Sequence, residues 1–116
     1  MASYTKKFQK IYDCPAEEMG KKITDTLTRL GGKFTDAHAP SSGVFSANFN
    51  KKIGGRPFNN RVTVEIRIKP QDEHRCTVMM RAYPVDPLGN KLAFGVRGQP
   101  AKMVIDTLVG DWQTTP

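Results

Sequence analysis

The sequence lacks the features that define several common protein classes. No apolar run approaches the length of a membrane-spanning helix, and the N-terminus has no apolar segment of the signal-peptide kind. Internal repeats and low-complexity tracts are absent. Of the 116 residues, 38% are hydrophobic and 25% are charged, which is typical of a globular protein of one domain. We therefore expect a single domain over residues 1–116 with a cytoplasmic location and no transmembrane segment.

Cysteine is scarce, with only Cys14 and Cys76, far apart in the chain. In a reducing compartment such residues pack as free thiols, and a disulfide is the alternative in an exported protein. A zinc site would need both cysteines together with His38 and His74. These four residues show only one loose pair, whereas structural zinc sites usually have two closely spaced pairs. We expect neither a metal nor another cofactor.

Catalytic motifs are also missing. Asp36, His38, Ser41 and Ser42 lie close together and have the residue types of a hydrolase. A working triad, however, needs its parts on different rigid elements, and no G-x-S-x-G turn surrounds either serine. Gly54–Gly55 lacks the lysine and helix that follow in a phosphate-binding loop. The sequence therefore predicts a protein that is not an enzyme.

Positive charge is in excess and unevenly placed. The net charge is +7, and residues 37–64 include no Asp or Glu. Within this window, the segment Lys51–Arg61 carries four cations, a Gly pair and one aromatic residue. Four charges are costly to bury without partners, and Gly54–Gly55 suits the positive-φ geometry of a hairpin tip. We call Lys51–Arg61 the basic finger and predict that it is a mobile hairpin held out by two strands.

The basic finger is the main candidate binding site, because an excess of cations favours acidic partners such as nucleic acid. Its Lys and Arg side chains would contact phosphates, and Phe58 would stack on a base. The lysines of the first predicted strand would widen the footprint if that strand neighbours the finger. Arg67, Lys69 and Arg81 would extend the stripe of positive charge, which Glu65 interrupts. The predicted nucleic-acid-binding residues are Lys51, Lys52, Arg56, Phe58, Arg61, Lys6, Lys7 and Lys10.

Hydrophobic periodicity predicts an α+β fold in the order strand, helix, three or four strands, helix. The strands are expected at residues 4–12, 33–35, 45–49, 62–69 and 75–83, and the helices at 15–30 and from Pro100 onward. In the segment 84–99, Leu92, Phe94 and Val96 alternate as in a strand, yet turn residues surround them, so strand and loop both remain open. Short connections between consecutive strands imply one antiparallel sheet with both helices on one face.

One core should unite these elements. The expected core residues are Met19, Ile23, Leu27, Phe45, Phe49, Val64, Ile66, Val78, Met80, Leu108 and Trp112. The element order resembles that of TATA-binding-protein repeats and, in larger form, that of helix-grip proteins of the START and birch-allergen kind. The resemblance is one of topology, so it implies a fold and no site residues.

Three functions are compatible with these features. The first is a binding domain that holds an acidic partner, in first place nucleic acid without sequence specificity. The helix-grip resemblance implies a second, a carrier of an apolar small ligand lined by Met79, Met80, Met103 and Phe94. Because the helices are short, we expect no enclosed cavity of roughly 300 Å³ or more. The third is an adaptor for an acidic protein or membrane surface, and an exposed strand edge would also allow a homodimer.

Overall fold

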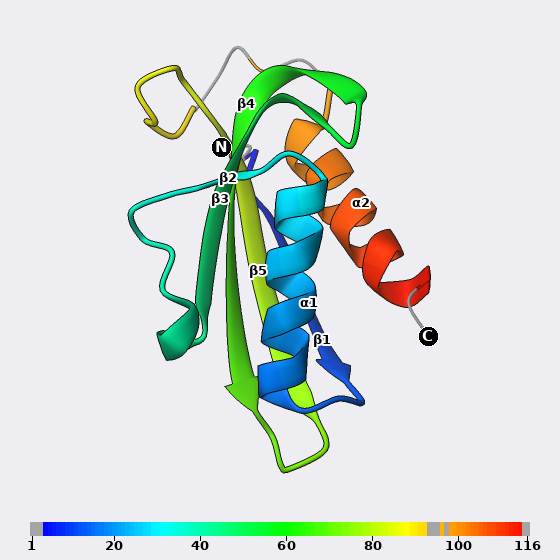
Figure 1. The fold of residues 1–116 in the computed structure, drawn as a ribbon. Helices are drawn as coiled ribbons and strands as arrows, with labels where there is room; N and C mark the ends of the chain where they lie inside the picture. The colour runs from blue at the N-terminus through cyan, green and yellow to red at the C-terminus, as the bar shows by residue number, and fades with distance from the viewer. Residues whose placement is uncertain (1–3, 93–95, 97, 115–116) are drawn as a thin grey trace.

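The computed structural model describes residues 4–92, 96 and 98–114. Its fold is α+β, with one five-stranded antiparallel sheet and two α-helices, which confirms the predicted class and order (Figure 1). The strands are β1 (Lys6–Tyr12), β2 (Lys33–Phe34), β3 (Val44–Ile53), β4 (Arg56–Pro70) and β5 (Cys76–Val85). The helices are α1 (Ala16–Arg29), the short 3-10 helix η1 (Pro40–Ser42) and α2 (Pro100–Thr114).

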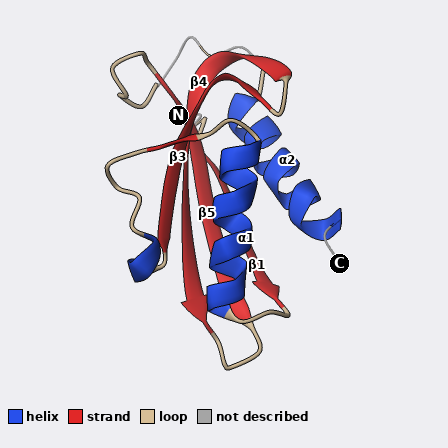
Figure 2. Ribbon diagram, viewed as in Figure 1, coloured by secondary structure: helices blue, strands red, loops and turns tan. Residues whose placement is uncertain are grey.

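The strand order in the sheet is β1-β5-β4-β3-β2, and every neighbouring pair is antiparallel. Strands β2 to β5 follow one another as a meander, whereas β1 pairs with β5 at the opposite edge from β2. Both α-helices pack on the same face, as predicted, and the strands form a layer behind them (Figure 2). No helix of the described residues covers the other face of the sheet, which we call the outer face.

Helix α1 forms where its apolar residues recur at helical spacing. Met19, Ile23 and Leu27 are buried against the sheet, as the periodicity predicts. Pro15 has an extended ψ of 150° and caps the helix rather than forming its first residue. Gly31 ends it with a φ of +92°, the left-handed conformation expected of a glycine cap.

The core occupies the space between the helices and the inner face of the sheet. Every residue of the predicted core is buried. On β4, the alternating residues Val62, Val64 and Ile66 point into this core. Burial of one such side chain contributes about 1.5–3 kcal/mol, so the inner face supplies most of the stability.

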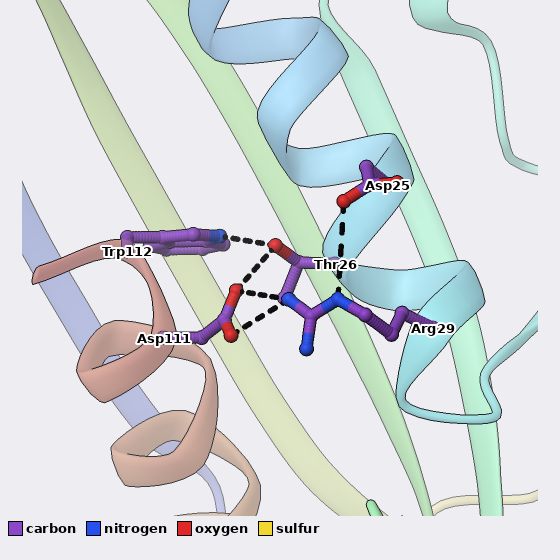
Figure 3. Close-up of polar contacts among 5 residues, drawn as sticks. All are labelled: Asp25, Thr26, Arg29, Asp111 and Trp112. Carbon is purple, nitrogen blue, oxygen red and sulfur yellow. Dashed lines mark hydrogen bonds and ion pairs between the residues drawn. The ribbon is translucent and has the colours of Figure 1, made fainter. Parts of the chain in front are cut away.

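A polar cluster joins the two helices at the edge of the core (Figure 3). Trp112 Nε1 donates a hydrogen bond to Thr26 Oγ1 (3.2 Å), and Thr26 Oγ1 donates one to Asp111 Oδ2 (2.8 Å). Arg29 Nη2 donates to both oxygens of Asp111, at 2.7 and 2.6 Å, and Arg29 also lies 3.9 Å from Asp25. The hydrogen bonds from Arg29 lower the pKa of Asp111. The cluster therefore fixes the position of α2 relative to α1.

The segment between β5 and α2, which the sequence left open, is a loop over residues 86–90. Asp86 Oδ1 accepts hydrogen bonds from the backbone N–H groups of Leu88 and Asn90, both at 2.9 Å. These bonds organise a turn at Pro87 and Gly89–Asn90, where the sequence already showed turn residues. Leu92 and Val96, two of the three residues whose alternation suggested a strand, belong to no strand. Phe94 lies outside the described residues.

Candidate functional site

The basic finger is not held away from the domain, which corrects the prediction from its charge. Ile53, near its tip, is fully buried in the core. The N–H of Gly54 donates a hydrogen bond of 3.0 Å to the carbonyl oxygen of Leu30, just after α1. The hairpin therefore bends over the end of α1, because one apolar side chain inside the basic segment anchors it.

The bend has a backbone cause at Lys51. This residue has a φ of +66°, and the pairing of β3 with β4 shifts register between Asn50 and Lys52. Such a bulge re-aims the following residues, which places Ile53 toward the core. At the tip, Gly54 and Gly55 have φ angles of +55° and +81°, which confirms the predicted glycine turn.

The four cations of the finger do not form one patch. Lys51, Lys52 and Arg56 are exposed, but Arg56 borders a hollow of about 370 Å³ against α2, on the helix side. Arg61 Nη1 donates a hydrogen bond of 3.0 Å to the carbonyl oxygen of Pro87, in the β5–α2 loop. Phe58 belongs to β4, and its side chain is outside the described part of the structure, so its stacking role stays a prediction.

The lysines of β1 do not adjoin the finger either. Strand β5 lies between β1 and the β3–β4 hairpin, so the condition for a shared footprint is not met. Lys7 pairs with Arg81 on the outer face, whereas Lys6 and Lys10 pair with residues of β5 that face the helices. The sequence analysis treated these lysines as one cluster, and the pairing of β1 with β5 had no local signal in the sequence.

The structure instead gathers cations on the outer face of the sheet. They come from β1, β2, β4 and β5, and the strand registers place them on the same side. Glu65 is the only acidic residue in any of the five strands. We call this surface the basic sheet face, and its cations are Lys7, Lys33, Arg61, Arg67, Lys69 and Arg81.

The centre of the basic sheet face is a hollow of about 590 Å³ lined by Lys7, Gln9, Arg67, Met79 and Arg81 among others. Arg81 Nε donates to Glu65 Oε2 at 2.9 Å, and this partner raises the pKa of Arg81. The hydrogen bonds with Glu65 thus offset one positive charge. Lys7 and Arg67 make no ion pair with any described residue.

Like charges meet directly on this face. Lys7 lies opposite Arg81 in the β1–β5 pair, and like charges placed directly opposite destabilise a sheet, a cost that the Glu65 partner of Arg81 reduces. Beside them, the Tyr83 ring lies 5.6 Å from Arg81 Cζ and 5.3 Å from Lys91 Nζ. Lys33, Tyr83 and Lys91 were missed from the sequence, since their proximity depends on the strand order.

The four residues considered for zinc are not brought together. Cys76 is buried, and burial raises the pKa of its thiol to about 11. His38 lies near the other edge of the sheet, stacked on Phe34 with ring centroids 4.0 Å apart. Within the described residues, no group of three or more His, Cys, Asp or Glu side chains is arranged to hold a metal ion.

The hydrolase-like residues do not form a triad. His38 Nδ1 accepts a hydrogen bond of 3.2 Å from the backbone N–H of Ser46, and burial lowers the pKa of the imidazole. No hydrogen bond in the described part of the chain joins His38 to Asp36, Ser41 or Ser42. His38 therefore holds the β2–β3 loop against the sheet.

None of the helices in the described residues is both long and apolar enough to cross a membrane.

Comparison with known proteins identifies a fold. The sequence matches no family model and no curated protein. The di-domain ARO/CYC protein BexL from the BE-7585A biosynthetic pathway aligns with 95% of this chain and 43% of its own, with a TM-score of 0.53 and 10% identity. This chain thus spans less than half of BexL.

Two further solved structures are similar. An uncharacterized protein from Bacillus thuringiensis aligns over 92% of this chain and 91% of its own, with a TM-score of 0.54 and 10% identity. A solution structure from Thermobifida fusca covers 93% of this chain and 83% of its own, with a TM-score of 0.49 and 12% identity. At such identities, likeness to BexL and to the Bacillus protein shows the fold alone: an α+β domain with one antiparallel sheet and two α-helices.

Proposed function

We propose that this chain is a non-enzymatic binding domain that holds an acidic partner, in first place nucleic acid, on the outer face of its sheet. The observation that carries the proposal is the basic sheet face. Its cations share one side of the sheet, where no helix of the described part of the chain covers them and where Glu65 is the only acid contributed by the strands. An open surface with this positive charge attracts polyanions and repels polycations.

The spacing of the cations suits a phosphate backbone. Neighbouring strands lie about 4.8 Å apart and rise about 3.3 Å per residue. Lys7 and Arg81 are direct partners on β1 and β5, and Arg67 lies two residues along β4 from the partner of Arg81, so the three backbone positions lie within about 12 Å of one another. Long Lys and Arg side chains on this scale reach several phosphates of one strand. Phosphate contacts carry no base information, so binding is expected to be salt-sensitive and independent of sequence.

The basic finger contributes less to the proposed binding than its four cations alone would imply. Arg61 belongs to the basic sheet face, Lys51 and Lys52 are exposed farther along the same hairpin, and we keep Phe58 as the proposed stacking residue. Arg56, Lys6 and Lys10 are left out because their positions are on the helix side.

The rival functions use different parts of the molecule or different partners. A carrier with its ligand between the sheet and α2 is not favoured, because Val104, Leu108 and Trp112 are buried there. An adaptor for an acidic protein or membrane would use the same cations as nucleic acid, so experiment must separate the two. A homodimer through the exposed edge of β1 stays a prediction.

The test is a titration of labelled single- and double-stranded oligonucleotides at several salt concentrations. The triple variant Lys7→Ala/Arg67→Ala/Lys69→Ala should lose about two units of salt slope, since each phosphate contact contributes about 0.7–0.9. The control Lys21→Ala/Lys22→Ala/Lys102→Ala removes the same charge from the helices and should bind as the wild type does.

Absence of binding at low salt would refute the nucleic-acid proposal. Equal losses in both variants would show that only net charge matters. Binding to anionic vesicles or polyglutamate without binding to oligonucleotides would favour the adaptor.

A further inference from the structure

A second hollow lies on the helix side of the sheet, between α1 and the loop that contains η1. Its volume is about 950 Å³, within the range of about 300–1,000 Å³ typical of small-molecule sites. Gly20, Phe45 and Ile68 contribute to its floor, and Thr24 on α1 and Ser42 on η1 contribute to its two walls. We call it the α1–η1 groove. It opens to solvent and its lining is mainly apolar.

The η1 wall is held in place by backbone hydrogen bonds. The N–H of Gly43 donates to the carbonyl oxygen of Pro40 (3.0 Å), and the N–H of Ile68 donates to the carbonyl oxygen of Gly43 (2.9 Å). Gly43 has a φ of +73°, and a Cβ there would lie 3.0 Å from the carbonyl oxygen of Ile68. Only glycine fits this position easily, so the wall is preformed.

The helix wall also contains a glycine that matters for the groove. Gly20 lies inside α1, where glycine is less stable than alanine. A Cβ at this position would lie 3.2 Å from Cζ of Phe45, which is a tight contact. The glycine therefore lets α1 approach the Phe45 ring and keeps the floor of the groove apolar and free of side-chain atoms from the helix.

The charges at the rim indicate what the groove binds. Glu17, Lys21 and Asp25 follow one another at one-turn intervals on α1, so charges of opposite sign alternate along the rim. This pattern gives no strong field for an anion or a cation. The uncharged polar side chains of the lining are hydroxyl groups, from Thr24 and Thr28 on α1 and from Ser41 and Ser42 on η1.

From these features we infer that the α1–η1 groove binds an uncharged, mainly apolar small molecule that carries a hydroxyl or carbonyl oxygen. The apolar floor takes the body of the molecule, and the hydroxyl groups of the walls bond its oxygen. This site is on the opposite side of the sheet from the basic sheet face, so it does not depend on the proposed nucleic-acid binding.

Nile red, an uncharged fluorescent probe with a carbonyl oxygen, tests the inference with the full chain. We expect saturable binding of one molecule per chain. Thr24→Trp and Ser42→Trp fill the groove from its two walls, and each should weaken binding at least about tenfold. Glu18→Trp introduces the same side chain at an exposed α1 position outside the groove, and should leave binding unchanged. Circular dichroism and thermal melting verify that each variant is folded.

Several results would overturn the inference. They are the absence of saturable Nile red binding, equal affinity in Thr24→Trp, Ser42→Trp and the wild type, and tighter binding of an anionic naphthalene sulfonate dye at the same site. Arg67→Ala should bind Nile red as the wild type does. Loss of Nile red binding in this variant would place the probe on the outer face and would also refute a separate groove site.

Discussion

On β4, Ile66 and Arg67 are neighbours in the chain and lie on opposite faces of the sheet. Ile66 is fully buried beneath the helices, whereas Arg67 is exposed on the basic sheet face and makes no ion pair with a described residue. The same contrast recurs along residues 61–69 of β4, where apolar and polar residues alternate, whereas β5 also places Met79 on the outer face. In β4, alternate residues either pack in the core or carry charge on the outer surface. Single substitutions should therefore affect either stability or binding, but not both.

The largest expected effect tests that division directly. Ile66→Ala should lower the free energy of unfolding by about 2–5 kcal/mol, because it removes buried methyl groups and leaves a cavity. Arg67→Ala should change it by no more than about 0.5 kcal/mol, since its side chain is exposed. Urea denaturation of both variants measures the difference. Similar losses in the two would show that the outer face also carries the fold.

The hairpin tip offers a comparison between two adjacent glycines. Both have positive φ, but a Cβ on Gly54 would lie 2.9 Å from Leu30 Cδ2, whereas one on Gly55 meets nothing within 4 Å. Gly54→Ala should therefore cost the about 1–2 kcal/mol of the left-handed conformation and a smaller additional amount, because the flexible end of the Leu30 side chain must move aside. Gly55→Ala should show the conformational cost only. Equal effects in thermal melts would contradict a close contact between the hairpin tip and the Leu30 side chain.

Acid should weaken the polar cluster between the helices. Asp111 has a lowered pKa in the folded protein, so its stabilising effect is complete above its unfolded pKa of about 4. It is then lost as the pH falls through the folded value. Asp111→Asn should remove this part of the pH dependence, and the matched Asp106→Asn on the same helix should not. Urea unfolding at pH 7 and pH 3 makes the comparison.

The smallest expected effect concerns the loop held by His38. Burial lowers the pKa of His38, so the neutral form is favoured in the folded state. The contribution of neutral His38 to the stability of the folded protein is present above the unfolded pKa of about 6.5. It is lost as the pH falls through the lower pKa of the folded state. Protonation also removes the acceptor for the N–H of Ser46. Hydrogen exchange at Ser46, corrected for intrinsic rates, should be faster at pH 5 than at pH 7, and His38→Asn should abolish the difference.

Much of the fold follows from local pattern. The period of two in residues 62–69 and the spacing of Met19, Ile23 and Leu27 predicted a strand and a helix that the structure contains. Gly54–Gly55 predicted the hairpin turn, because few other residues adopt positive φ easily. These signals involve only neighbouring residues, so no knowledge of tertiary structure was needed.

The candidate site was harder to predict, because it depends on long-range contacts. Ile53 is one apolar residue among cations, and its packing near Leu30 has no local signal. The pairing of β1 with β5 places Lys7 beside Arg81, and this neighbour relation joins residues distant in the chain. Arg67, Lys69 and Arg81 were recognised as exposed cations, but the sequence ranked them below the finger.

The most direct test of the basic sheet face compares two variants in one oligonucleotide titration over a series of salt concentrations. One is the outer-face variant Lys7→Ala/Arg67→Ala/Lys69→Ala, and the other is the finger variant Lys51→Ala/Lys52→Ala/Arg56→Ala/Arg61→Ala. The outer-face variant should flatten the salt slope by about two units. The finger variant should flatten it by less than the loss of four phosphate contacts predicts. A wild-type slope in the outer-face variant, with binding abolished in the finger variant, would contradict the account and locate the site at the finger.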